Sequence, residues 1–230
     1  MAEKGQQKSQ IKSRERVSQR GEVFTAEREV NAMLDLVADE CIRPDSRFLE
    51  PACGDGNFLS AILGRKLSFL VKKYGKSPRD FEKYSILAIG SLYGIDIMND
   101  NVLACRERLY SLWDKQYTAV CRKNASSRAR EATQFIISRN IICGNALTLM
   151  CVDDSGNDTP SPIVFSEWAL IDPIHMQRTD YTMAGLLASE GGLFGRGGGI
   201  ADEGGTFLKR YVTHYKKVQE DGEQSVSERL

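Results

Sequence analysis

The sequence predicts an α/β protein with a doubly wound, mostly parallel sheet of four to five strands. Apolar, β-branched segments alternate along the chain with longer segments in which apolar residues recur at helical spacing. At residues 48–59 a short apolar strand, a turn with two glycines and the start of a helix follow one another directly. Such a strand–turn–helix forms nucleotide-type pockets at the carboxyl edge of a parallel sheet.

The individual elements follow from periodicity and from turn residues. Apolar residues at helical spacing predict helices at residues 26–40, 57–74, 78–83 and 99–113. Apolar runs typical of buried strands lie at residues 47–49, 85–95, 135–143 and 163–171. The remaining segments are predicted as helix or linker at 114–132, a short turn or helix at 146–150, a loop at 153–162, and a final strand or helix at 206–217.

Length and charge set the domain organisation. A chain of 230 residues predicts one main domain, and 31 basic against 31 acidic residues give no argument for nucleic acid from bulk charge. Residues 1–20 are more basic, which predicts a disordered arm; an arm that contacts phosphates is the alternative. A cofactor-binding domain is expected at residues 21–185, followed by a glycine-rich loop and C-terminal segment at residues 186–230.

Cysteine and histidine spacing argues against a metal site. The six cysteines form no CxxC pair, and the two histidines are far from any metal-ligand spacing. We therefore expect reduced core thiols, no bound metal and a cytoplasmic protein. No apolar run is long enough to span a membrane, so no membrane partner is expected.

The turn after the first strand indicates the class of ligand. Gly54 and Gly56 let the backbone bend sharply and approach a ligand without a Cβ in the way. A dinucleotide fingerprint has a third glycine three residues later, where this chain has Leu59. The turn therefore favours a mononucleoside ligand that lacks a pyrophosphate.

Four segments, in order, carry a resemblance to a known family. They are Gly21 to Thr25, Glu50 to Leu59, Tyr93 to Asp96, and Cys143 to Leu147. Together they resemble the upstream motif and motifs I, II and III of the S-adenosylmethionine-dependent DNA adenine-N6 methyltransferases of restriction–modification systems. The resemblance covers residues 21–150 and implies a Rossmann-like class I methyltransferase fold, with S-adenosylmethionine as cofactor and DNA as partner.

The resemblance also implies roles for individual residues. Glu50 would hold the ammonium of the cofactor through ordered water, Asp96 would accept the ribose hydroxyls, and Asn145 would meet the adenine amino group. The family usually has aspartate where this chain has Asn145, and its upstream motif commonly continues with proline where Ala26 stands. The full set of expected cofactor residues is Phe24, Thr25, Glu50, Pro51, Ala52, Gly54, Gly56, Phe58, Asp96, Ile97, Asn145 and Ala146.

The catalytic motif of the family has only a partial counterpart. In the family, Asn or Asp, Pro, Pro and an aromatic residue follow the fourth strand, accept the amino group of a flipped adenine and stack on its ring. The nearest match is Asp172-Pro173-Ile174-His175, in which Asp172 is the acceptor, Pro173 keeps the turn and His175 replaces the stacking ring. An ordinary Asp-Pro turn is the competing interpretation.

Three functions stay open at this point. The chain is an active adenine-N6 DNA methyltransferase, completed by a homodimer or by a second subunit that supplies target recognition. Alternatively, it is an inactive or partner-dependent cofactor-binding subunit. A methyltransferase for protein amides or RNA is the third candidate, which the segment at residues 21–25 disfavours.

Overall fold

The computed structural model describes residues 25–188 and 208–220 of the chain. Two short helices, α2 (Glu27–Asp35) and α3 (Ala38–Ile42), begin this part. A single helix was predicted here, but the chain leaves helical geometry at Val37, where φ is −126°. The predicted basic arm and most of the glycine-rich stretch lie outside the described residues.

A five-stranded mixed sheet follows, in the order β1-β2-β3-β4-β5. The first three strands are parallel: β1 (Phe48–Glu50), β2 (Leu92–Asp96) and β3 (Ile141–Asn145). Two antiparallel strands complete it: β4 (Met150–Val152) and β5 (Asp158–Pro162). The α/β class is as predicted. Strands β4 and β5 were not predicted, since a short turn or helix was expected at residues 146–150 and a loop at residues 153–162.

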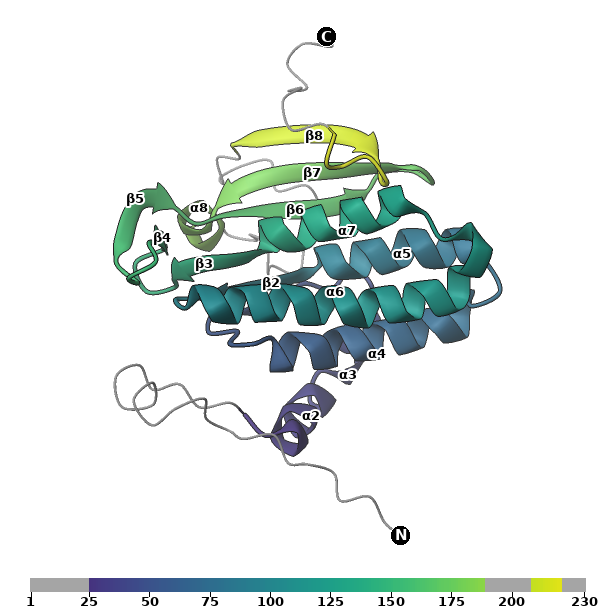
Figure 1. Cartoon of the computed structure of the whole chain (residues 1–230), viewed down its shortest axis with the longest axis horizontal. Coiled ribbons are helices and arrows are strands. Elements are labelled where there is room, and N and C mark those ends of the chain that lie inside the picture. Colours follow the sequence, from purple (N-terminus) through teal and green to yellow (C-terminus); the bar gives the residue numbers. More distant parts are fainter. Residues whose placement is uncertain (1–24, 189–207, 221–230) are drawn as a thin grey trace.

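Four helices cover one face of this sheet: α4 (Asn57–Tyr74), α5 (Pro78–Gly90), α6 (Asn99–Cys121) and α7 (Ser127–Asn140). A 3₁₀ turn, η1 (Arg122–Asn124), joins α6 to α7. Figure 1 shows the four helices running alongside one another. Their apolar residues form the main core with Leu92 and Ile141 of the sheet. The helix predicted at residues 57–74 is confirmed at both ends.

Two predicted strands were wrong over part of their length. Residues 85–90 belong to α5 and residues 135–140 to α7, so the strands begin only at Leu92 and Ile141. Every residue from Ser85 to Gly90 is buried. A helix buried on all sides has no polar stripe, so its apolar run resembles that of a buried strand.

A second, antiparallel sheet covers the other face. It contains β6 (Val164–Leu170), β7 (His175–Thr182) and β8 (Lys209–His214), and the short helix α8 (Met183–Ala188) follows β7. Residues 163–171 were predicted as a strand of the parallel sheet; they form β6, but β6 pairs with β7. A smaller core joins the two sheets. In it the rings of Tyr93 and Phe165 pack edge to face, with their centroids 5.3 Å apart.

Buried polar contacts fix the segments that connect these layers. Lys66 of α4 is fully buried, and its ammonium donates to the carbonyls of Arg43 and Ser46 at 2.7 and 2.6 Å and to the Ser91 hydroxyl at 2.9 Å. These bonds hold the turn before β1 against the start of β2. The six cysteines are all free thiols, and four of them are buried, in agreement with the sequence-based expectation.

Candidate functional site

A cavity of about 530 Å³ lies where β1, β2 and β3 end. Parallel strands place their carboxyl ends at one edge of a sheet, so the segments that follow them converge there. The loop after β1, the end of β2 and the turn after β3 form the walls, and residues at the start of α2 close one side. The volume lies within the usual range for small-molecule sites.

The loop between β1 and α4 turns through two glycines with positive φ. Gly54 and Gly56 have φ of +53° and +85°, values that other residues adopt only with strain. A Cβ on Gly56 would lie 2.7 Å from the Cys105 sulfur of α6, so glycine is required there by packing as well as by φ. Both glycines were predicted to let the backbone approach a ligand; Gly54 lines the cavity, whereas Gly56 does not.

Two contacts that the sequence did not predict fix this loop. Asp55 forms a two-fold ion pair with Arg108 of α6, in which one N···O distance is 2.9 Å. The Asn57 side chain donates to the Thr25 carbonyl at 2.8 Å and so ties the segment before α2 to the loop. Phe24, the other residue expected from that segment, lies outside the described residues.

Asp96 connects the end of β2 to the glycine loop. Its Oδ2 accepts the Gly54 amide at 2.9 Å, and its Oδ1 accepts the Met98 amide at 2.8 Å and the Asn101 side chain at 3.2 Å. A carboxylate offers about four acceptor positions. Asp96 lines the cavity, and these three hydrogen bonds leave one acceptor position on Oδ2.

Glu50 supplies a second carboxyl group to the cavity. Burial raises the pKa of Glu50 above its ordinary value, and a hydrogen bond from the Ala52 amide offsets part of this effect. A cationic ligand group beside Glu50 would favour the ionised carboxylate and lower this pKa again. The position therefore suits a ligand ammonium.

Asn145 shapes the turn after β3. Its Oδ1 accepts the Leu147 amide at 3.0 Å, and its amide nitrogen donates to Asp158 of β5 at 3.2 Å. A side-chain carbonyl oxygen has two acceptor positions, so Oδ1 can still accept one further hydrogen bond. Leu147, the last residue of the segment that resembles motif III, is 94% exposed at the rim of the cavity.

The structure brings most of the predicted cofactor residues together. The cavity is lined by Thr25, Glu50, Pro51, Ala52, Gly54, Phe58, Asp96, Ile97, Asn145 and Ala146. Seven further lining residues were not in the expected set: Val30, Cys53, Asn57, Met98, Asn101, Gly144 and Leu147. Four of them, Cys53, Asn57, Gly144 and Leu147, lie within the segments that carry the resemblance. Asn101 had a weak signal in the sequence, since it lies in the first turn of the helix that follows Asp96.

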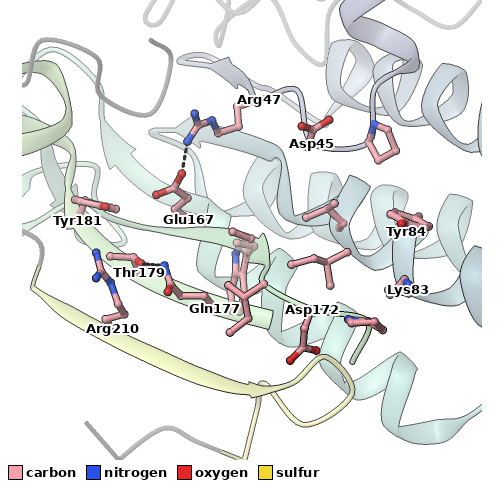
Figure 2. A pocket seen from close by; sticks show the side chains of 17 residues that line it. Asp45, Arg47, Lys83, Tyr84, Glu167, Asp172, Gln177, Thr179, Tyr181 and Arg210 are labelled. Carbon is pink, nitrogen blue, oxygen red and sulfur yellow. Dashed lines mark hydrogen bonds and ion pairs between the residues drawn. The ribbon is translucent and has the colours of Figure 1, made fainter. Parts of the chain in front are cut away.

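The predicted catalytic residues lie elsewhere. Asp172 and Pro173, in the turn between β6 and β7, line a separate cavity of about 690 Å³ that shares no residue with the first (Figure 2). Asp172 accepts the Ile174 and His175 amides at 2.8 and 2.7 Å and contacts the His175 ring at 2.6 Å. These hydrogen bonds lower the pKa of Asp172 to about 2, and the bond from the Ile174 amide has the largest effect. The structure thus does not bring this motif to the cavity at the ends of β1 to β3.

Comparison with family models, curated proteins and solved structures finds no match for this chain. Among the described residues, no three His, Cys, Asp or Glu side chains are grouped so that they could hold a metal. The helices of the described part are all too short or too polar to cross a membrane. The assignment of function therefore depends on the geometry of the cavity and on the motifs that line it.

Proposed function

We propose that this chain binds S-adenosylmethionine at the carboxyl edge of β1 to β3, as part of an adenine-N6 DNA methyltransferase. One observation carries the proposal. Segments that lie up to 120 residues apart, each resembling a motif of that family, line a single cavity of about 530 Å³. Parallel strands bring their end segments together in any such sheet, so the support comes from the residue types that meet there, Glu50, Asp96 and Asn145.

The cavity has the groups that this cofactor needs. Glu50 suits the ammonium, and the remaining acceptor position on Asp96 suits a ribose hydroxyl. Ile97 offers an apolar contact for the adenine ring, and the Asn145 side-chain oxygen can accept from its amino group. When bound, the cofactor supplies a methyl group on a sulfonium; the residues named here bind and orient it.

The position of Asp172 favours a partner-dependent enzyme over one that acts alone. It lies on a different cavity from the cofactor residues, and its Oδ1 already accepts two backbone amides. An acceptor for the adenine amino group would then come from a second subunit or from another part of the chain. This supports the candidate of a cofactor-binding subunit that needs a partner for transfer.

A methyl-transfer assay separates these possibilities. Tritiated S-adenosylmethionine is incubated with unmodified genomic DNA and the protein, alone and with the product of the neighbouring gene, and RNA and protein substrates run in parallel. Label on adenine N6 supports the proposal, and label only on RNA or protein supports the third candidate. If Asp172→Ala abolishes transfer but the matched rim variant Asp45→Ala does not, Asp172 is catalytic after all.

No transfer in any combination, together with measurable cofactor binding, would identify an inactive cofactor-binding subunit. No binding of S-adenosylmethionine at all would overturn the whole proposal.

A further inference from the structure

The formal net charge of the chain is zero, but its charges are distributed unevenly. At the end of the molecule opposite the cofactor cavity, α4 ends, α5 begins, and η1 joins α6 to α7 (Figure 1). Residues 72–79, 122–128 and 214–217 meet there, and we call this surface the far end. Because α4 starts at the glycine loop and has 18 residues, its last turn lies roughly 25 Å from that loop.

Exposed basic side chains accumulate at the far end. Seven of them form no ion pair with another described residue: Lys72, Lys73, Lys76, Arg79, Arg122, Lys123 and Arg128. They come from four segments that are distant in the sequence, namely the end of α4, the start of α5, η1 and the start of α7. The fold thus gathers these charges on one surface.

The carboxylates nearby do not neutralise this charge. Four of them already lie in ion pairs of their own, Asp80 with Lys83 at 3.6 Å, Glu82 with Lys216 at 2.9 Å, Asp114 with Arg130 at 2.7 Å and Glu220 with Lys217 at 3.2 Å. Glu131 has no cationic partner in the described part of the chain. The ten residues after Glu220 add three acidic residues and one basic residue, so an excess of positive charge remains.

A cavity of about 540 Å³ opens in the far end, between the start of α5, η1 and the turn after β8. Arg79, Asn124, His214 and Lys216 line it. The Nδ1 atom of His214 accepts the Lys216 amide at 3.1 Å, so the neutral ring carries its proton on Nε2, which can donate. Burial, the largest effect, lowers the pKa of His214 and keeps the ring neutral at pH 7. The cavity therefore offers donors from four side chains to an oxyanion.

Glu82 also lines this cavity, and its charge is balanced inside the protein. Its side chain is only 5% exposed. It accepts the hydroxyl groups of Tyr117 and Tyr215 at 2.6 and 2.8 Å and the ammonium of Lys216 at 2.9 Å. These three donors satisfy the carboxylate, which in turn holds Lys216 at the cavity.

Arg122 occupies a backbone position that favours glycine. Its φ and ψ are +49° and −120°, close to the first central position of a type II′ turn. A residue with a Cβ is strained there. The arginine side chain is exposed and has no ion pair with another described residue, so packing within this part of the chain does not explain it. Contact with an anionic partner would.

We infer that the far end binds the phosphate backbone of a nucleic acid, with one phosphate in the cavity beside Arg79 and others along Arg122, Lys123 and the lysines that end α4. A nucleic-acid strand carries one charge about every 3.4 Å, which suits cations gathered from several segments. Arginine can bind a phosphate through two parallel hydrogen bonds. Such contacts hold the strand without reading its base sequence. This inference does not depend on S-adenosylmethionine binding.

Fluorescence anisotropy with a short labelled DNA duplex, measured without cofactor, tests the inference. The full chain should bind the duplex, and the logarithm of the association constant should fall linearly with the logarithm of the salt concentration between about 50 and 200 mM. Arg79→Gln and Lys123→Gln should each weaken binding about 3- to 10-fold near 100 mM salt and make the slope shallower by about 1. Lys209→Gln, at an exposed lysine at the other end of β8, should change neither.

Arg122→Gly separates binding from stability. Glycine adopts the backbone angles of this position without strain, so the urea midpoint of the variant should be at least that of the wild type. Duplex binding should nevertheless weaken about 3-fold or more, because a phosphate contact is lost. A loss of binding in this variant cannot then be attributed to unfolding.

Poly-glutamate is the competing polyanion in the same assay. Unlabelled duplex should displace the labelled duplex at a lower concentration of charge than poly-glutamate does. Equal or better displacement by poly-glutamate would identify an acidic protein as the partner and overturn the inference. It is overturned as well if the wild type does not bind the duplex at the lowest salt concentration, or if the three variants bind it as the wild type does. Calorimetry with S-adenosylmethionine tests the cofactor proposal separately.

Discussion

Replacing Asp96 by asparagine tests the ribose contact at the cofactor cavity. The substitution keeps the size of the side chain and one carbonyl oxygen, which can still accept the Met98 amide and the Asn101 side chain. It puts an NH₂ group where Oδ2 now accepts the Gly54 amide at 2.9 Å. The acceptor position left for a ligand, also on Oδ2, is lost with it.

The structure gives the expected size of the effect. One hydrogen bond to a charged acceptor contributes about 1.5–3 kcal/mol, so S-adenosylmethionine should bind about 10- to 100-fold more weakly to Asp96→Asn. Loss of the contact to Gly54 should lower the free energy of unfolding by about 1–3 kcal/mol as well. Calorimetric titration and urea unfolding measure the two effects.

A double-mutant cycle separates ligand contact from loop support. Wild-type protein and Asp96→Asn are each titrated with S-adenosylhomocysteine and with its analogues that lack the 2′- or the 3′-hydroxyl. If Asp96 accepts a ribose hydroxyl, removing that hydroxyl costs affinity in the wild type and much less in the variant. Equal costs in both proteins for both analogues would refute the ribose contact. Asp35→Asn, at a 70% exposed carboxylate outside the cavity, is the control.

Three further predictions concern single residues. Since burial raises the pKa of Glu50, affinity for the ammonium-bearing cofactor should rise as pH increases through that pKa, and calorimetry of Glu50→Gln should not show this rise. Gly56→Ala should destabilise the protein by more than about 1 kcal/mol in urea unfolding, because φ is +85° and the Cβ would meet Cys105, whereas Gly64→Ala, in open space within α4, should stabilise it by about 0.5–1 kcal/mol. Burial lowers the pKa of Lys66 to about 7, below its unfolded value of 10.5. The buried charge therefore lowers the free energy of unfolding by its full amount below pH 7, and this free energy rises as pH increases toward 10.5. The free energy of unfolding of Lys66→Met should not rise between pH 7 and pH 9.5 in this way, and the same rise in the variant as in the wild type would contradict the prediction.

Local signals in the sequence were sufficient to predict which residues lie at the carboxyl edge of β1 to β3. The glycine turn marks the start of α4 and Gly75 its end, and an acidic residue closes β2. Because parallel strands end at one edge, predicting the strands that precede Glu50, Asp96 and Asn145 was enough to place these residues at one cavity. A doubly wound, mostly parallel sheet was predicted from the same alternation. Only the first three strands are parallel, and helices α4 to α7 cover one face while a second sheet covers the other, so the doubly wound arrangement was wrong.

Features that depend on tertiary packing could not be predicted from the sequence. Residues 85–90 are apolar in α5 because helices and strands surround them, and the sequence pattern is the same for a strand. Residues 163–171 were predicted as a strand, but the pairing of β6 with β7 was not, because a strand's own residues do not show which segment it will pair with. The position of Asp172 follows from that pairing, so Asp172 lies on a different cavity from Glu50, Asp96 and Asn145, with which the sequence-based prediction grouped it.

A crystal structure of the protein soaked with S-adenosylhomocysteine tests the central claim most directly. The account predicts density for the ligand between the loop after β1, Asp96 and Asn145. Density in the cavity beside Arg47 and Trp168, or no ligand at a saturating concentration, would contradict it.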